Sequence, residues 1–140
     1  MTNAAPTSPS QARHPYSPVR STGSGLLYVS GQLGIADGSI VEGGVVQETR
    51  QALANLRGRL ASAGLELRHL VKITVYLASM DDRNAMDEVY QQSLPEPLPA
   101  RTCVAVAALP YAARVELDAI AARDEDPPRG HIIRGGRDDV

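Results

Sequence analysis

Two short runs in the second half of the chain carry a cation, a thiol and a carboxylate, residue types that could form a small-molecule site. The first run, residues 99–106, has Arg101 and Cys103 two positions apart, and the second, residues 115–119, has Glu116. Both runs alternate small or apolar residues with polar ones, which predicts half-buried strands whose alternate side chains share a face. If the strands are neighbours, a cation, a thiol and a carboxylate lie over one surface of the sheet. We therefore expect a small-molecule site there.

Each of these residue types suits a particular task. A guanidinium is planar and permanently charged, so Arg101 can bind a carboxylate through two parallel hydrogen bonds. A partly desolvated Glu116 has a raised pKa and can exchange protons with water. Cys103 is more often a small buried hydrophobe than a nucleophile. The alternatives are an interface salt bridge from Arg101 to Asp87 or Asp118, and a solvated carboxylate at Glu116.

Composition narrows the class of protein. The chain has 140 residues, enough for one domain, with 43% hydrophobic and 21% charged residues. Its net charge is −2, and we find no basic cluster interleaved with aromatics, so we expect no nucleic-acid partner. The single cysteine fits a reducing compartment. Since neither a secretory signal nor an apolar run of about 20 residues is visible, we predict a cytoplasmic protein with no membrane partner.

Metal or cofactor chemistry has little support in the sequence. His14, His69 and His131 lack the spacing of metal ligands with one another or with Cys103. Gly43-Gly44 lacks the surrounding glycine pattern of a nucleotide loop and is interpreted as a turn. We predict no metal site and no cofactor.

Hydrophobic periodicity predicts the elements that position the candidate residues. An edge strand interrupted by Pro15 and Pro18 precedes a strand over 26–32, and Asp37-Gly38 favours a hairpin. Apolar spacings of three and four predict a helix over 46–63 that ends at Gly64. A strand over 71–77 has Val71, Ile73, Val75 and Leu77 on one face. Ser79 and Asp82 then resemble a capping box that opens a short helix with Met86, Val89 and Tyr90 facing inward.

The predicted order is β-β-α-β-α-β-β, an α+β fold with a mixed sheet covered on one face by two helices. The uncovered face also carries apolar residues, so we expect a homo-oligomer. Residues 13–123 form the predicted domain. A disordered lead-in over 1–12 and a polar tail over 124–140 flank it.

Six collinear segments resemble one known family. They are Pro15-Tyr16-Ser17, Val29-Ser30-Gly31-Gln32, the Gln51–Leu60 helix with Asn55-Leu56, Val71–Val75, Pro99–Val104 and Val115-Glu116-Leu117. Together they resemble the reactive intermediate deaminase family (RidA/YjgF) from about Tyr16 to Ala121. The resemblance implies a chorismate-mutase-like fold, a homotrimer with clefts between subunits, and no cofactor. It also implies hydrolysis of enamines and imines such as 2-aminoacrylate and 2-iminopropionate to 2-keto acids and ammonia.

The same resemblance assigns roles to individual residues. Arg101 matches the arginine that grips the substrate carboxylate, and Glu116 matches the acid that activates water. Cys103 lines the pocket beside them. The remaining wall matches Tyr16, Ser30 and the Gly31 backbone.

One departure from the family pattern concerns Asp87. It stands where the family usually has Asn, three residues before Tyr90. A carboxylate there could pair with Arg101 and compete with a substrate carboxylate, or raise the apparent pKa of Glu116 as one of a coupled pair. Alternatively, it faces solvent. We count Asp87 as a candidate substrate-binding residue on which substrate choice depends.

Other functions remain open at this point. With Asp87 as an added acid–base group, the protein could act on a larger, pathway-specific imine or enamine, as aminomuconate deaminases do. It could instead be a non-catalytic trimer that binds small carboxylates or acts like a chaperone. Ribonuclease activity is the least favoured because the chain is acidic and has no basic-aromatic surface.

Overall fold

The computed structural model describes residues 14–124. The predicted lead-in, and the predicted tail beyond Asp124, lie outside the described residues.

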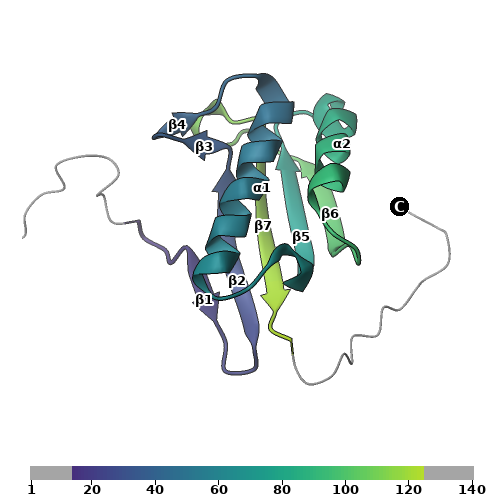
Figure 1. Ribbon diagram of the computed structural model, residues 1–140. Helices are drawn as coiled ribbons and strands as arrows, with labels where there is room; N and C mark the ends of the chain where they lie inside the picture. The colour runs from purple at the N-terminus through teal and green to yellow at the C-terminus, as the bar shows by residue number, and fades with distance from the viewer. Residues whose placement is uncertain (1–13, 125–140) are drawn as a thin grey trace, which may run out of the picture.

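One five-stranded sheet forms the back layer of the molecule (Figure 1). Its spatial order is β1-β2-β7-β5-β6, with bounds β1 Val19–Ser21, β2 Leu26–Leu33, β7 Val115–Ala122, β5 Leu70–Leu77 and β6 Ala100–Ala105. Every neighbouring pair is antiparallel except β5 and β6, which are parallel. The predicted mixed sheet is therefore confirmed. The predicted hairpin at Asp37-Gly38 joins β3 (Ile35–Ala36) to β4 (Ser39–Ile40), and both turn residues have positive φ.

Both helices, α1 (Gly44–Ser62) and α2 (Arg83–Ser93), cover the same face of this sheet (Figure 1). α1 begins two residues earlier than predicted, after Gly43 in a left-handed conformation. Most of the predicted buried face is confirmed, but Val45 is buried at its start, while Val46 is only partly buried. α2 follows a 3₁₀ turn, Met80–Asp82, whose Ser79 side chain accepts from the N–H of Asp81 at 3.2 Å. Its predicted inward residues are all buried: Met86, Val89 and Tyr90.

The core lies between the helices and the sheet. In β7 every second residue is buried, and the buried set is Val115, Leu117, Ala119 and Ala121. β5 follows the same rule, with one correction to its predicted pattern. A bulge between Leu70 and Lys72 turns Val71 outward, where it is 45% exposed, and Leu70 takes its place in the core.

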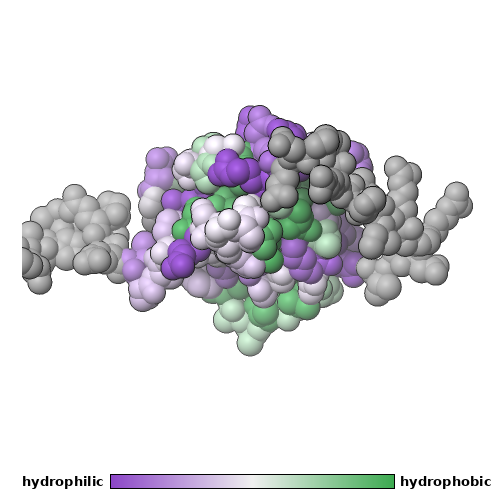
Figure 2. All heavy atoms as spheres, turned by 90° about the horizontal axis from the view of Figure 1, so that it is seen from below, coloured by the Kyte–Doolittle hydropathy of each residue, from purple (hydrophilic) through white to green (hydrophobic). Residues whose placement is uncertain are grey.

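The opposite face of the sheet has no helix over it within residues 14–124. Tyr28 of β2 and Val104 of β6 are 45% and 38% exposed there. Figure 2, a view from below, shows hydrophobic residues reaching the surface along one margin and hydrophilic residues gathered along the other. Such an uneven distribution is typical of a surface that associates with another copy or a partner.

Two polar residues of α1 fix the loops that lead to the candidate site. The Asn55 Nδ2 donates to the carbonyl oxygens of Leu33 and Ile35, at 2.9 and 3.0 Å. The buried Glu48 accepts through Oε1 from the backbone N–H of Arg114 at 2.8 Å, just before β7 begins. Because buried polar groups stabilise only when they are paired, these bonds hold both loops in one position.

Candidate active site

Arg101 lies on the helix-covered side of the sheet, in register with the buried Ile73 of β5. Its Nη1 donates to the Asp87 Oδ1 of α2 at 2.5 Å, and its guanidinium lies 4.8 Å from the centre of the Tyr90 ring. Arg83, one turn before Asp87, approaches the other carboxylate oxygen at 3.7 Å. Asp87 therefore pairs with Arg101, as one of the two sequence-based alternatives predicted, and does not simply face solvent.

The charges of this cluster favour an ionised arginine and a neutral thiol. Partial burial lowers the pKa of Arg101, but the hydrogen bond and the charge of Asp87 outweigh it, so the net shift is upward. Burial raises the pKa of the Cys103 thiol, although the nearby Arg101 acts in the opposite direction. A thiol of raised pKa is a poor nucleophile at neutral pH, which agrees with a lining role for Cys103.

Glu116 lies on the other face of the sheet, and the expectation that Arg101, Cys103 and Glu116 share one surface of a chain is wrong. β5 separates β6 from β7: Ile73 is opposite Arg101, whereas Tyr76 is opposite Glu116. Residues three positions apart on one strand point to opposite faces. The alternation of residues within β6 and β7 could not predict that Arg101 and Glu116 lie on opposite faces, because it does not show that β5 lies between these two strands.

A cavity of about 800 Å³ opens around Glu116. It brings together four of the predicted site residues, which are Tyr16, Ser30, Gly31 and Glu116. The Ser30 hydroxyl donates to the carbonyl oxygen of Ser17 at 2.6 Å, which ties β2 to the loop that carries Tyr16. The ring of Tyr16 stacks on His14 at 5.1 Å between centroids. Arg101, Cys103 and Asp87 do not line this cavity.

Gly31 provides the space in which the Glu116 side chain lies. A Cβ added to Gly31 would lie 2.9 Å from the Glu116 Cδ and closer still to its Oε2. Gly31 stands at the irregularity in β2 between Val29 and Gln32, where the pairing with β7 shifts. The glycine and the bulge thus let the carboxylate lie directly against the backbone of the neighbouring strand.

The environment of Glu116 favours its protonated form. Burial, and then the charge of Asp118, raise the pKa of Glu116 above its usual value. Asp118 in turn accepts a hydrogen bond from the Tyr76 hydroxyl at 2.9 Å, the main reason why the pKa of Tyr76 is raised. The sequence suggested Asp87 as the second carboxylate of a coupled pair with Glu116. Within one chain, that neighbour is Asp118.

Among the cavity-lining residues that sequence reasoning missed are Tyr28, Tyr111 and Asp118. Tyr111 is 75% exposed and has a φ of 58°, a left-handed conformation that L side chains rarely adopt. The scarcity of aromatic residues in the sequence was the feature that could have pointed to these tyrosines. The chain has five Tyr and no Phe or Trp, and three of the five line this cavity.

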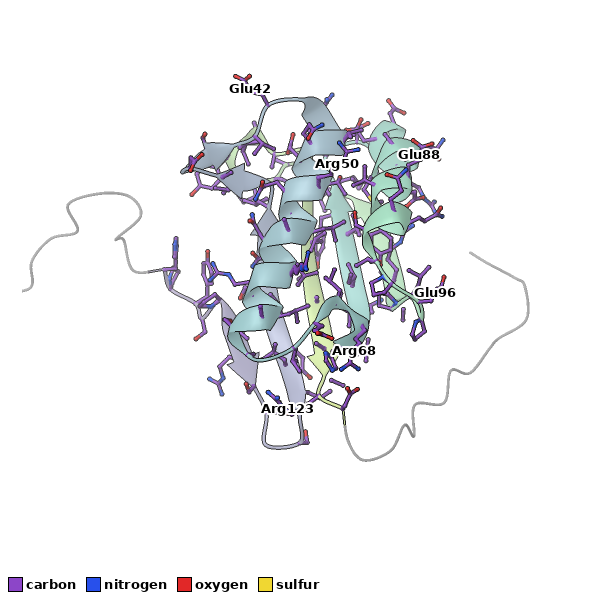
Figure 3. All side chains as sticks on the ribbon, in the orientation of Figure 1. Glu42, Arg50, Arg68, Glu88, Glu96 and Arg123 are labelled. Atoms are coloured by element: carbon purple, nitrogen blue, oxygen red, sulfur yellow. The ribbon has the colours of Figure 1, made fainter. Side chains whose placement is uncertain are left out.

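A second charged cluster lies away from the site, at the lower end of the sheet, where Figure 3 labels Arg68 and Arg123. Arg68 bridges Glu66 and Asp124, each at 2.7 Å. His69 accepts from the N–H of Glu66 through Nδ1 and therefore donates from Nε2 to Asp124 at 3.0 Å. These bonds join the end of β7 to the turn before β5, a structural role.

Neither a metal cluster nor a membrane helix is found in residues 14–124. No group of three or more His, Cys, Asp or Glu there could hold a metal ion. Over the same residues, no helix is both long and apolar enough to cross a bilayer.

Comparison with known proteins gives two curated relatives of particular interest. The fission yeast mitochondrial protein mmf1 is 44% identical over 100 residues, which cover 69% of this chain and 62% of that protein. A goat protein named 2-iminobutanoate/2-iminopropanoate deaminase is 46% identical over 99 residues, which cover 69% of this chain and 72% of the relative. The chain thus spans less than two thirds of mmf1 and nearly three quarters of the goat protein.

Solved structures agree with the fold. RidA from an Antarctic Psychrobacter superposes with a TM-score of 0.75 at 34% identity, over 80% of this chain and 91% of the other. Escherichia coli TdcF with bound serine gives a TM-score of 0.75 at 32% identity, over 81% and 91%. The family model described as Endoribonuclease L-PSP matches residues 5–123. With this match, these relatives and the six motifs, the chain belongs to the Endoribonuclease L-PSP family, which is the RidA/YjgF family.

Proposed function

We propose that the protein hydrolyses small imines and enamines that bear a carboxylate, to a 2-keto acid and ammonia, at a site completed by two subunits. The observation that carries this proposal is the separation of Arg101 and Glu116 onto opposite faces of one sheet. One chain therefore offers an anion-binding half-site and an acid–base half-site. A second copy can bring the Arg101 half-site of one subunit to the Glu116 cavity of another.

The residue chemistry fits this reaction. The Asp87 carboxylate uses Nη1 of Arg101, and a guanidinium has further N–H donors that can take a substrate carboxylate. A water molecule then adds to the imine carbon as ionised Glu116 accepts its proton. The same proton is delivered to the nitrogen, which gives a carbinolamine. A second proton then passes from the carbinolamine hydroxyl to the nitrogen by way of Glu116, the C–N bond breaks, and ammonia and the keto acid leave. A carboxyl of raised pKa suits both transfers, and such catalysis typically contributes about 10²–10⁴ in rate.

The names of relatives support the substrate class. Goat, mouse and human relatives at 46%, 46% and 42% identity are named 2-iminobutanoate/2-iminopropanoate deaminase. The TdcF structure contains serine, an amino acid whose carboxylate matches the group that we assign to Arg101. For the assembly, we propose the homotrimer implied by the family resemblance. The sheet face without helices, with Tyr28 and Val104 exposed, is the surface available to other copies.

The direct test is an activity assay. 2-Aminoacrylate and its imine are generated in situ, and the release of pyruvate and ammonia is followed with and without the protein. We expect acceleration by the wild-type protein and a loss of about 10²-fold or more in Arg101→Ala, because an anchoring charge-assisted pair is removed. Arg50→Ala, an exposed arginine of α1, is the matched control. An Arg101→Ala variant as active as the parent would overturn the anchoring role.

The two-subunit site has its own test. Arg101→Ala and Glu116→Gln chains are unfolded, mixed in equal amounts and refolded together. Random assembly of a cyclic oligomer gives about a quarter of sites with an intact Arg101 and an intact Glu116, so about a quarter of the activity returns. If each site took both residues from one chain, the mixture would stay as inactive as its parents.

A second candidate is a deaminase for a larger imine or enamine. The cavity of about 800 Å³ and its three tyrosines favour it, since drug-sized ligands occupy pockets of roughly 300–1,000 Å³. Rates for a series of imino acids of increasing size distinguish the candidates. Comparison with Asp87→Asn shows whether that carboxylate selects among them.

Two further functions have less support. A non-catalytic carboxylate-binding trimer would show saturable keto-acid binding without deamination. Cleavage of RNA has the least support because the chain has a net charge of −2 and no basic cluster interleaved with aromatics. The cytoplasm remains our prediction for location, although two fission yeast relatives are named as mitochondrial.

A further inference from the structure

The tyrosine on β5 and the two carboxylates on β7 form a small network beside the cavity. Tyr76 is the register partner of Glu116, and Thr74 is the partner of Asp118, so all four face the side without helices. The Tyr76 hydroxyl reaches across to the Asp118 Oδ2 at 2.9 Å. Glu116 and Asp118 are two positions apart on one strand and line the same cavity. Two carboxylates are therefore held together, and one of them is anchored by a neutral donor.

We propose that Tyr76 and Asp118 are positioning residues for Glu116: the Tyr76 hydroxyl fixes the Asp118 carboxylate, and the charge of Asp118 moves the range in which Glu116 exchanges protons to higher pH, in addition to the effect of burial. Neither residue needs to touch the substrate. The inference rests on the proposed function only in giving Glu116 an acid–base task.

The neutral Tyr76 hydroxyl is suited to hold Asp118 because it leaves the charge of that carboxylate in place. A cation beside Asp118 would neutralise its charge, whereas a phenol satisfies one lone pair and leaves the carboxylate negative. Burial, and then the charge of Asp118, raise the pKa of Glu116. Glu116 is thus protonated over a higher pH range than an ordinary carboxyl, as a group that must return a proton to nitrogen requires.

Other titratable groups surround this network and define the controls. The cavity is also lined by His14, Tyr16, Arg20, Tyr28 and Tyr111. On β5, Lys72 faces the same side and donates to the Thr102 hydroxyl at 2.6 Å. In the proposed assembly, Arg101 of a second copy approaches as well. Of the carboxylates in residues 14–124, Asp118 is the one whose charge raises the pKa of Glu116.

The central experiment compares Asp118→Asn with wild type. The amide keeps an oxygen that accepts from Tyr76 and removes the charge beside Glu116. We expect the limb of the kcat/KM–pH profile that Glu116 governs to move to lower pH by about 0.5–1 unit, since a nearby like charge raises a carboxyl pKa. Glu42→Gln, an exposed carboxylate at the upper end (Figure 3), removes the same charge and leaves the limb unchanged.

Tyr76→Phe tests the second half of the inference through a double-mutant cycle. Without the hydroxyl, Asp118 is no longer fixed, so the Asp118→Asn change moves the limb less in the Phe background than in wild type. Equal shifts in both backgrounds would show that Tyr76 is only structural. A limb that does not move in Asp118→Asn would overturn the proposal as a whole.

A second readout separates this inference from the proposed function. The side-chain carboxyl of Glu116 is titrated by carbon NMR in wild type, Asp118→Asn and Glu42→Gln proteins, with no substrate present. A lower Glu116 midpoint in Asp118→Asn alone supports the network even if the protein proves inactive on imines. An unchanged midpoint refutes it even if the protein is an efficient deaminase.

Discussion

The two half-sites of this molecule differ in how far their charges are satisfied. On the helix-covered face, Arg101 already has a carboxylate partner in Asp87 and an aromatic ring beneath it. On the other face, Glu116 has a like charge nearby and a raised pKa, in an open cavity. The charge of Arg101 is balanced within the chain by Asp87, whereas the ionised form of Glu116 is disfavoured by its surroundings. This difference supports our proposal that Arg101 binds the substrate and Glu116 transfers protons.

Glu116→Gln gives the largest expected effect. The amide keeps the shape but cannot accept a proton, so kcat falls by about 10²–10⁴. Binding of the keto-acid product changes by less than about 3-fold, because the carboxylate anchor is intact. Initial rates and calorimetric titration with pyruvate measure the two quantities. If Glu116→Gln instead weakened binding and left kcat unchanged, the division between the half-sites would be refuted.

Gly31→Ala tests whether the position of the Glu116 carboxylate against the β2 backbone matters for catalysis. The new methyl group would occupy the space of the Glu116 carboxylate and displace it from its position. We expect kcat to fall by about 10–100-fold, since misplaced catalytic groups lose rate steeply. Gly58→Ala is the matched control, because a Cβ there meets nothing within 4 Å. Gly58 is inside α1, so that variant should be stabilised by about 0.5–1 kcal/mol with unchanged activity.

The fold was largely predictable from the sequence, whereas the division of the site was not. Apolar alternation in β7 and the three-and-four spacing of α1 indicated which faces are buried. The structure confirmed the face of β7 and most of that of α1, where Val45 is buried in place of Val46. The insertion of β5 between β6 and β7 is a long-range pairing that no local pattern encodes. The bulge that exposes Val71 depends in the same way on the pairing of β5 with β7. The relation of Arg101 to Glu116 therefore required the structure.

Substitutions in the two half-sites should change the free energy of unfolding in opposite directions at pH 7. Arg101→Gln leaves the partly buried Asp87 with Arg83 alone, at 3.7 Å, and lowers the free energy of unfolding by about 1–2 kcal/mol. Glu116→Gln removes a carboxylate whose pKa is raised by folding. Such a group destabilises the folded state above its unfolded pKa, so the variant gains stability at pH 7, by less than about 0.5 kcal/mol after solvent screening.

The pH dependence checks the sign of the second effect. Folding binds the Glu116 proton more tightly, so the advantage of Glu116→Gln shrinks as the pH falls through the raised folded pKa and vanishes below the unfolded one. Urea unfolding at pH 7 and pH 4, at one protein concentration, measures the difference. An advantage of Glu116→Gln that grew on acidification would contradict the raised pKa.

Asp87→Asn gives the smallest expected effect and tests the Arg101 half-site most directly. We propose that the Asp87 carboxylate offsets part of the positive charge of Arg101 that a substrate carboxylate would meet, so its replacement by an amide should lower KM by about 3–10-fold. kcat should stay within about 2-fold, because Asp87 pairs with Arg101 and the proposed proton transfers belong to Glu116. Glu88→Gln, the next residue on α2 and exposed, is the matched control for removing one charge (Figure 3). If KM instead rises in Asp87→Asn, Asp87 orients Arg101 for the substrate. The Arg101–Asp87 ion pair would then help to form the substrate-binding half-site and would not compete with the substrate.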